Sequence, residues 1–314
     1  MMRMTTAWVF PGQGSQFVGM ARDLYEKFSS ARLVLDATDS VLGFPLSKLM
    51  FEGPEAELTD TVNAQPALLA HSIAALAALQ QASNNSLPEP AFAAGHSMGE
   101  YSALVATGAL DFAEGIKLVR ARGNAMKRAG IERPGAMAAI LGVDDAKVQE
   151  ICNAAGAVQV ANFNAPGQIV ISGEKEAIER AVDSAKKAGA KRAIVLAVSI
   201  AAHSELMRPA LQEFRAAVTM TPLRAARVPV ISNVTAQPMS EPSEMREEML
   251  AQLTSSVQWV KSVEWMEAQG VTEFLELGPK DVLTGLNKRI AKNATTKPIG
   301  TVEQIEKFLG GTSA

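Results

Sequence analysis

A serine between two glycines is the residue in this 314-residue sequence best suited to do chemistry, in Gly95-His96-Ser97-Met98-Gly99. In the Gly-x-Ser-x-Gly pattern a strained turn between a strand and a helix exposes the serine oxygen, and the glycines remove Cβ atoms that would collide there. An apolar run precedes the motif and a helical pattern follows it. The N-terminus of that helix would favour developing negative charge. The alternative is a turn whose serine only caps the helix.

A nucleophilic serine needs a general base, most often histidine, and the sequence has three candidates: His71, His96 and His203. His71 lies within an apolar helical pattern, where a hydrogen-bonded structural histidine is expected. His96 adjoins Ser97, and neighbours on a sharp turn usually point in different directions, so we expect it to shape the turn or contact substrate. His203 follows an apolar run and two alanines, and it remains as the predicted base. Otherwise it would be an exposed loop histidine without a role.

No carboxylate completes a serine–histidine–acid triad on spacing alone. Such an acid would normally stand between the serine and the histidine in chain order, and Asp111, Asp144 and Asp145 all do. Because none has a distinguishing context, a backbone carbonyl or an amide could orient the histidine instead. The competing nucleophile, Cys152, lies in a helical pattern without a glycine turn, so we predict a structural thiol.

The elements around these residues indicate an α/β fold. The apolar run Ala7 to Phe10 ends abruptly at Pro11-Gly12 and predicts a buried strand that leads into a tight loop. A buried helix is predicted from Gln65 through Leu79, with Pro66 near its start. The order of strand, glycine turn and helix around Ser97 is the signature of this fold class.

Residues 134–198 have a different pattern and predict a separate small unit, which we call the insert. Its expected elements are a strand, a helix, two strands, a helix and a strand, over Ala136–Val143, Asp144–Ala155, Val158–Asn162, Ile169–Ser172, Glu174–Ala188 and Ala193–Val198. This β-α-β-β-α-β order is the ferredoxin-like unit. We therefore expect an α/β domain of residues 1–133 and 199–314, interrupted by a ferredoxin-like subdomain, with a ligand site in the cleft between them.

Composition limits the function classes. The chain is 47% hydrophobic and 20% charged, with a formal net charge of −3, which argues against a nucleic-acid binder that relies on bulk charge. No run approaches eighteen apolar residues, so no membrane span is expected, and the early apolar patch is too short for a secretion signal. A single cysteine fits a reducing compartment. We expect a cytoplasmic protein.

The motifs together resemble the malonyl-CoA:acyl carrier protein transacylases, a family that shares its acyltransferase fold with domains of polyketide synthases. The similarity extends over nearly the whole chain and includes Phe10 to Gln16, Glu52-Gly53-Pro54, Gln65-Pro66-Ala67, Gly95 to Tyr101, Arg120 to Gly123, Asn162 to Gln168, Ser199 to His203, Val257-Gln258-Trp259 and Leu277-Gly278-Pro279.

The resemblance implies a fold and a set of roles. The larger domain should be α/β-hydrolase-like, Ser97 should carry the acyl group, and His203 should be its base and acid. The Gln13 loop and the backbone N–H of Met98 should form the oxyanion hole. Arg122 should bind the malonyl carboxylate, because a planar, permanently charged guanidinium suits a free carboxylate.

Further positions and partners follow from the same resemblance. In relatives carbonyl acceptors orient the histidine, and Gln258 is the candidate orienting position here; His96 and Asn162 are supporting positions. The implied reaction moves malonyl from malonyl-CoA to the phosphopantetheine thiol of acyl carrier protein by a ping-pong route, for fatty acid or polyketide synthesis. It needs no metal and no redox cofactor.

Several alternatives stay open on sequence alone. A serine esterase or thioesterase would share Ser97 and His203, and a non-catalytic docking subunit would keep the fold without needing them. Ile200-Ala201-Ala202 matches neither pattern that separates malonyl from methylmalonyl selection in polyketide domains. Two basic clusters are candidate docking surfaces for an acidic carrier protein, or solvated helix faces: Lys186, Lys187, Lys191 and Arg192, and Lys280, Lys288, Arg289 and Lys292.

Overall fold

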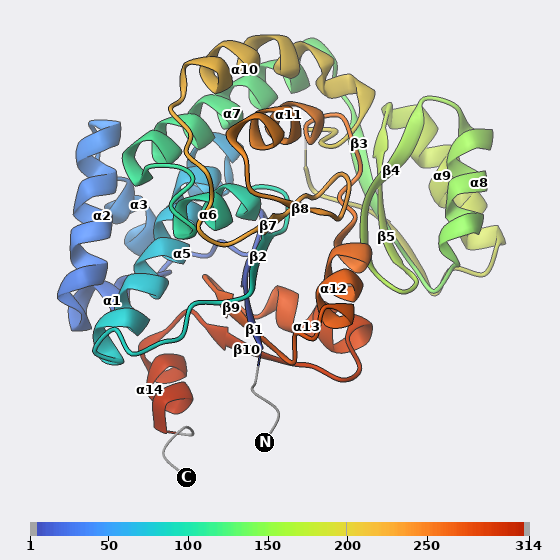
Figure 1. Ribbon diagram of the computed structural model, residues 1–314. Helices are drawn as coiled ribbons and strands as arrows, with labels where there is room; N and C mark the ends of the chain where they lie inside the picture. The colour runs from blue at the N-terminus through green and yellow to red at the C-terminus, as the bar shows by residue number, and fades with distance from the viewer. Residues whose placement is uncertain (1–4, 199, 311–314) are drawn as a thin grey trace.

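The computed structural model describes residues 5–198 and 200–310 and contains two sheets. The larger sheet runs through the centre of the molecule (Figure 1). Neighbouring strands are parallel except for the last pair, which is antiparallel. The central strand β1 therefore ends at the same edge as β2, and the loops that follow these two strands start side by side. The strand order is β10 (Thr295–Ile299), β9 (Glu273–Leu277), β1 (Thr6–Phe10), β2 (Phe92–Gly95), β7 (Val230–Ile231) and β8 (Pro238–Met239).

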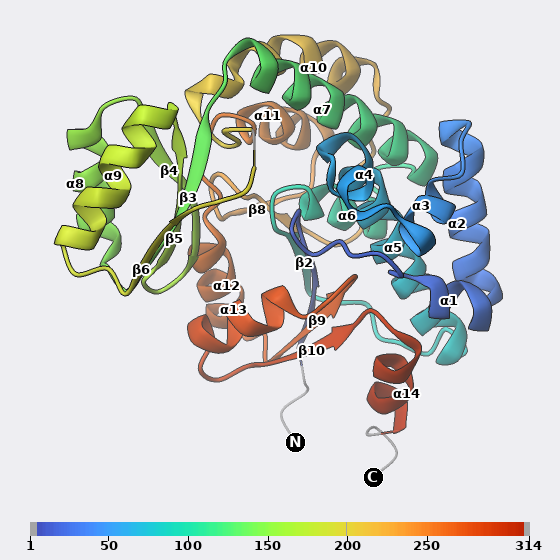
Figure 2. The same ribbon diagram turned by 180° about the vertical axis from the view of Figure 1, so that it is seen from behind.

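Helices cover both faces of this large sheet, which explains why strands β1 and β9 are buried along nearly their whole length (Figure 2). Trp8 and Phe10 pack into the core of one face, whereas Ala7 and Val9 pack into the core of the other. The second face is covered by α12 (Trp259–Ala268) and α13 (Val282–Ile290). The first core is built from α1 (Arg22–Lys27), α2 (Ser29–Leu42), α3 (Leu46–Glu52), α4 (Glu55–Thr59), α5 (Thr61–Ala82), α6 (Gly99–Ala106), α7 (Phe112–Glu132), α10 (Arg208–Met220), α11 (Pro242–Ala251) and α14 (Val302–Gly310).

Helix α5 begins earlier than the sequence predicts. It starts at Thr61, where the side chain of Asp60 accepts a hydrogen bond from the backbone N–H of Val62 at 3.2 Å, so Pro66 lies inside the helix instead of near its start. Proline has no N–H for the carbonyl four residues earlier, that of Val62. Arg120 from α7 donates to this carbonyl at 2.9 Å and replaces the missing bond.

The same helix is the one described helix that is long and apolar enough to cross a membrane. It has 22 residues, but 83% of its most apolar window is buried inside the protein. A helix apolar on all sides and enclosed by other helices is typical of the core of a large domain. We therefore interpret α5 as the core helix.

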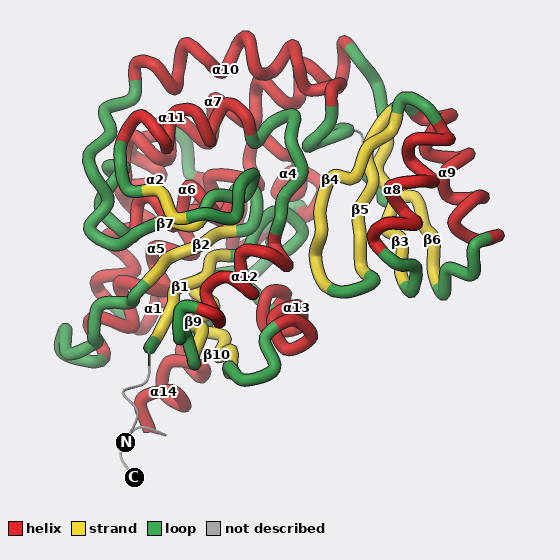
Figure 3. Tube along the Cα trace, turned by 45° about the vertical axis from the view of Figure 1, so that its right-hand side comes forward, coloured by secondary structure: helices red, strands yellow, loops and turns green. Residues whose placement is uncertain are grey.

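The insert forms the second sheet, which is antiparallel between all neighbours (Figure 3). The predicted order of strands and helices is present, with ends that differ by at most three residues. Both helices pack on one face around a separate apolar core. The strand order is β4 (Val158–Ala165), β5 (Gln168–Gly173), β3 (Ala136–Leu141) and β6 (Arg192–Val195), and the helices are α8 (Asp145–Ala155) and α9 (Lys175–Lys187).

Edge strand β4 joins the insert to the large domain. Its residue Ala161 accepts a hydrogen bond from the backbone N–H of Val257 at 2.8 Å, and Phe163 donates to the carbonyl of Val257 at 2.9 Å. Asn162 and Val257 thus form a short parallel bridge just before α12. Ser199, at the predicted boundary of the insert and in the Ser199–His203 motif, lies outside the described residues, and so do residues 1–4 and 311–314 of the predicted larger domain.

Candidate active site

The serine turn, residues 95–99, joins β2 to α6 in the way that the Gly-x-Ser-x-Gly pattern predicts. The backbone of Ser97 has a φ of 51°, in the left-handed region that residues other than glycine rarely adopt. A Cβ on Gly95 would lie 1.9 Å from the carbonyl carbon of Gly99, and one on Gly99 would lie 2.1 Å from the carbonyl oxygen of Phe10. Both positions therefore require glycine, and the close approach holds Ser97 in its strained backbone conformation.

A buried network of hydrogen bonds holds the serine turn in place. The backbone N–H of Ser97 donates to the side-chain oxygen of Asn233 at 2.7 Å, and the amide of Asn233 donates to the carbonyl of Gly95 at 2.7 Å and to Glu100 at 2.5 Å. Burial, together with the nearby Glu248, raises the pKa of Glu100 well above its usual range. The network thus fixes the backbone on both sides of Ser97.

The structure brings His203 to Ser97. The Nε2 atom of His203 lies 2.8 Å from Ser97 Oγ, and its Nδ1 atom lies 2.8 Å from the backbone carbonyl oxygen of Gln252. Since a carbonyl can only accept, Nδ1 carries the proton and Nε2 is free to accept one from the serine. The imidazole is 3% exposed, and burial, followed by the charge of Arg122, lowers the pKa of His203 to about 3. His203 is therefore neutral in the form shown.

The prediction that Gln258 orients the histidine is wrong. The acceptor at Nδ1 is the carbonyl of Gln252, and Gln258 instead begins α12, where its N–H donates to the carbonyl of Asn233 at 2.7 Å. A backbone carbonyl has no sequence signature, so spacing could not distinguish these two glutamines. Gln258 is connected to the site through the loop that carries Asn233.

The other two supporting positions, His96 and Asn162, bond to groups other than the Ser97 hydroxyl and the His203 imidazole in the part of the chain that the structure describes. His96 Nε2 is 2.7 Å from the side-chain oxygen of Asn164, and its ring lies 5.7 Å from that of Trp259. The bond to Asn164 ties the His96 imidazole to β4 of the insert, and among the described residues this ring makes no hydrogen bond to Ser97 or His203. Asn162 is buried on β4, and among the described residues it makes no bond to either member of the pair.

Arg122 projects from α7 into the same site. One guanidinium nitrogen lies 3.4 Å from Ser97 Oγ and 2.8 Å from the side-chain oxygen of Gln252, and the other donates to Gln65 at 2.9 Å. The side chain is 1% exposed, and its centre lies 5.4 Å from the ring of Tyr101. Burial lowers the pKa of Arg122. Among the described residues no carboxylate is within ion-pair distance of this guanidinium.

The Gln13 loop, which follows β1, lies against the serine turn. A Cβ on Gly12 would be 2.4 Å from the carbonyl oxygen of His96, so the loop and the turn are in direct contact. Gln13 itself is exposed, and its side-chain oxygen accepts from Thr61 at 3.1 Å. Thr61 accepts in turn from Gln65, which binds Arg122. The predicted oxyanion loop and the predicted carboxylate-binding arginine are therefore linked through the start of α5.

Met98 directly follows Ser97 and occupies the N-cap position of α6. Its backbone N–H belongs to the N-terminal end of the helix, where peptide dipoles favour negative charge. The side chain of Met98 is fully buried and belongs to the core of the large domain.

Residues that the sequence set aside have structural positions. His71 is buried in α5 and bonds to the carbonyl of Gly300 at 2.8 Å, and burial lowers its pKa to about 4. Cys152 is buried in the core of the insert, and burial raises the pKa of its thiol to about 11. Asp111 caps α7 through the N–H groups of Ala113 and Glu114.

Sequence reasoning gave no role to several residues that complete the site. Gln65 and Glu100 lie in motifs that carry the family resemblance, so a role could have been sought there. Gln252 and Asn233 lie outside those motifs. Only the folded chain brings them to Ser97.

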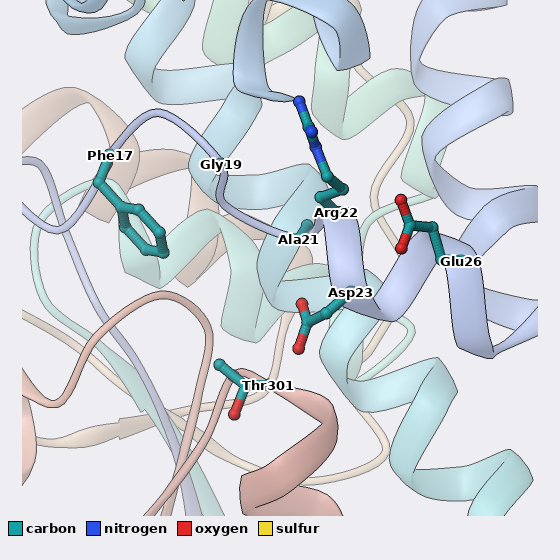
Figure 4. A pocket seen from close by; sticks show the side chains of 8 residues that line it. Phe17, Gly19, Ala21, Arg22, Asp23, Glu26 and Thr301 are labelled. Carbon is teal, nitrogen blue, oxygen red and sulfur yellow. The ribbon is translucent and has the colours of Figure 1, made fainter. Parts of the chain in front are cut away.

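A cavity of about 310 Å³ elsewhere does not belong to this site (Figure 4). It lies near the starts of α1 and α14, and two of its three charged lining residues are already hydrogen-bonded. Asp23 accepts from the N–H of Val302 at 2.8 Å, and Arg22 donates to the carbonyl of Phe51 at 2.8 Å. None of the predicted site residues lines this cavity.

The fold agrees with the similarity of this chain to known proteins. Residues 7–306 match the family described as acyl transferase domain. The chain is 46% identical over 304 residues to the malonyl CoA-acyl carrier protein transacylase of Bacillus subtilis (strain 168), covering 96% of this chain and 95% of that protein. It is 45% identical to the protein of the same name from Escherichia coli (strain K12), covering 93% and 95%.

Solved structures give the same result. The crystal structure of an acyl-carrier-protein-S-malonyltransferase from Bartonella henselae is 43% identical, with a TM-score of 0.94, and covers 99% of this chain and 100% of that one. A malonyl-transacylase solved in complex with its type II polyketide synthase acyl carrier protein is 40% identical, with a TM-score of 0.93 and coverage of 98% and 99%. The chain belongs to the acyl transferase domain family, and it is an acyltransferase with a mixed α/β fold.

Proposed function

We propose that this acyltransferase moves the malonyl group of malonyl-CoA to the phosphopantetheine thiol of acyl carrier protein. The observation that carries the substrate assignment is the buried guanidinium of Arg122, 3.4 Å from Ser97 Oγ and without a carboxylate partner among the described residues. Burying an unpaired cation is costly, and an acyl group that ends in a carboxylate would remove that cost. The names of the similar relatives point to the same substrate.

In the first half of the reaction, Ser97 gives its proton to His203 Nε2 while Oγ attacks the thioester carbonyl. The C–S bond then breaks, and the same Nε2 proton passes to the coenzyme A sulfur. Neutral His203 is suited to the first step because its Nδ1–H is held by the carbonyl of Gln252. Coenzyme A leaves as its thiol, and malonyl remains as an ester on Ser97.

In the second half, the phosphopantetheine thiol of the carrier protein gives its proton to His203 Nε2 and attacks the malonyl ester. The bond to Oγ breaks, and Oγ takes the proton back. In both halves the backbone N–H of Met98 and the Gln13 loop hold the negative oxygen of the tetrahedral intermediate, helped by the N-terminus of α6. The reaction is ping-pong and needs no metal or redox cofactor.

We assign this chemistry to an α/β-hydrolase-like domain of residues 1–133 and 199–314 and a ferredoxin-like subdomain of residues 134–198. The order of strands in the small sheet and its separate core support this division. Both substrates are soluble, which supports a cytoplasmic location without membrane or nucleic-acid partners.

Of the two basic clusters, the one that contains Lys280 is the better candidate for carrier-protein docking. Lys280 donates to the carbonyl of Gly14 at 3.2 Å, so this cluster borders the Gln13 loop beside the site. Lys186 in the other cluster is 3.6 Å from Asp183, which reduces its free charge.

The proposal is tested by comparing two fates of the acyl group. The enzyme is mixed with malonyl-CoA in the presence of carrier protein, and malonyl-carrier and free malonate are measured together. We expect transfer to dominate, because the site is built for a charged acyl group and a thiol acceptor. Malonate release that equals or exceeds transfer would identify a thioesterase instead. A Ser97→Ala enzyme with full transfer activity would contradict the assigned nucleophile.

A further inference from the structure

The backbone of His203 is under constraint in the structure. Its φ is 58°, in the left-handed region, and it follows the segment that leads from β6 back to the large domain. A residue held in this region costs about 1–3 kcal/mol and persists only where surrounding groups fix it. The position of the imidazole at Ser97 therefore depends on what holds the backbone around residue 203.

One side chain of the insert holds that backbone. The amide nitrogen of Gln159 donates to the carbonyl of His203 at 3.1 Å and to the carbonyl of Thr254 at 3.1 Å. Its side-chain oxygen accepts from the N–H of Glu205 at 3.1 Å. Thr254 is two residues after Gln252, whose carbonyl binds His203 Nδ1. A single amide thus ties together both backbone segments that fix the imidazole.

The position of Gln159 on β4 directs it to this task. Its neighbours Val158 and Val160 pack into the core between the small sheet and helices α8 and α9, so Gln159 points to the opposite face, towards the large domain. Figure 3 shows β4 as the strand of the small sheet nearest to the large domain. The catalytic domain and the insert therefore meet at this amide.

Only an amide matches the three bonded groups. Two carbonyls need two N–H donors and one N–H needs an acceptor, and a primary amide offers this set. A carboxylate would place negative oxygens against two carbonyl oxygens, and an apolar side chain would leave all three backbone groups without this partner.

We propose that Gln159 is a positioning residue for acyl transfer, which acts through the backbone of His203 and Thr254 to set the imidazole against Ser97. The proposal rests on the proposed function in taking Ser97 and His203 as the reacting pair. It adds that the insert, through Gln159, controls the efficiency of proton transfer within that pair.

The test compares Gln159→Glu and Gln159→Leu with Gln149→Glu, the same chemical change on the exposed face of α8, where the amide bonds only to Asn153. We expect both Gln159 variants to lose roughly 10- to 100-fold in kcat, because small misplacements of a catalytic group have effects of this size. KM for malonyl-CoA should change less than about twofold, because Arg122 is untouched. Gln149→Glu should match the wild type.

The pH dependence provides a readout that a merely structural role would not move. As the pH falls, the carboxylate of Gln159→Glu takes up a proton, regains one O–H donor and loses its repulsion with the carbonyls. Its activity relative to the wild type should therefore rise as the pH falls, whereas Gln159→Leu should show no such gain. Unchanged thermal unfolding of Gln159→Glu will confirm that the variant is folded.

Three results would overturn the proposal: unchanged kcat in both Gln159 variants, a loss confined to KM, or an equal loss in Gln149→Glu. A second readout separates a failure of the role proposed for Gln159 from a failure of the proposed substrate. The rate at which a fluorophosphonate probe labels Ser97 needs only the serine and its base. If the wild type is labelled but transfers no malonyl group, the substrate assignment fails. The role of Gln159 can still be tested in that case, because slower labelling of Gln159→Glu than of the wild type would support it and equal labelling would overturn it.

Discussion

Three side chains at the site are held by different means, and each has a different consequence for the reaction. Ser97 is fixed by the strained turn. His203 is held by the carbonyl of Gln252 at Nδ1 and by the amide of Gln159 at its own backbone carbonyl. Arg122 is held by the neutral side chains of Gln65 and Gln252. Because the partners of Arg122 are uncharged, its positive charge stays available for an anionic substrate.

Replacing Arg122 should separate charged from uncharged acyl groups. In Arg122→Ala we expect kcat/KM for malonyl-CoA to fall by on the order of 10²-fold, since a charge-assisted pair to a buried carboxylate is lost. Transfer of acetyl should be spared or improved. Arg122→Lys should recover only part of the malonyl activity, because lysine lacks the two-pronged donor. Steady-state kinetics with both thioesters measure this, and equal losses for malonyl and acetyl would remove the assigned role.

The pH profile of the free enzyme should reflect the buried base. Since burial and Arg122 lower the pKa of His203 from 6.5 to about 3, the imidazole stays neutral at any pH well above about 3. We therefore expect kcat/KM for malonyl-CoA to lack an acid limb near 6.5 and to stay level on going down from about pH 8 to about pH 5. A fall in kcat/KM centred near pH 6.5 would show that the pKa of His203 is not lowered.

The residues that do chemistry could be predicted from the sequence better than those that support them. Ser97 followed from its glycines, and His203 from elimination among three histidines. The acceptor at His203 Nδ1 could not be found, because it is the backbone carbonyl of Gln252 and any residue type could supply it. Gln258 was the wrong choice for this reason.

At the level of elements, the contact between the serine turn and the Gln13 loop is what makes the site possible. Gly95 and Gly99 approach each other and β1 more closely than any Cβ would allow. Two parallel strands that end at the same edge bring these loops together. The site is therefore sensitive to one added methyl group.

Gly95→Ala should abolish the fold of the turn. Its Cβ would lie 1.9 Å from backbone atoms that cannot move independently, so we expect a loss of at least about 3 kcal/mol in unfolding free energy, or insoluble protein. Gly285→Ala is the matched control, because a Cβ there meets nothing within 4 Å on helix α13. It should gain about 0.5–1 kcal/mol, as alanine is the better helix former. Chemical denaturation measures both, and a soluble Gly95→Ala protein of wild-type stability would refute the steric argument.

Element types were predictable and some element ends were not. The insert followed from its alternating pattern and helical spacing, which local sequence determines. Helix α5 begins at Thr61 and contains Pro66. It tolerates this proline because Arg120, which is distant in sequence, donates a hydrogen bond to the carbonyl of Val62. Strand β7 covers only Val230–Ile231, because its pairing depends on the neighbouring strands β2 and β8.

On the scale of the whole molecule, the insert and the large domain contact each other at a second place besides Gln159. Arg289 of α13 donates to the side chain of Gln168 at 2.5 Å and to the carbonyl of Pro166 at 2.6 Å, in the turn between β4 and β5. This contact is exposed, so it should restrain the insert without contributing much to stability.

Arg289→Ala should loosen the insert with little effect on the core. We expect faster amide hydrogen exchange in residues 158–173 and a loss of no more than about 1 kcal/mol in unfolding free energy. Lys288→Ala, which removes an exposed cation from the same helix, should leave exchange in this segment unchanged. Equal exchange in the two variants would show that the contact does not hold the hairpin.

The central claim is that Ser97 carries the acyl group between the two thiols. The most direct measurement is the intact mass of the enzyme after mixing with malonyl-CoA, before and after addition of acyl carrier protein. We expect a mass increase of one malonyl group per chain, its loss when the carrier is added, and no increase in Ser97→Ala. Carrier malonylation by an enzyme that never acquires this mass, or an unchanged increase in Ser97→Ala, would contradict it.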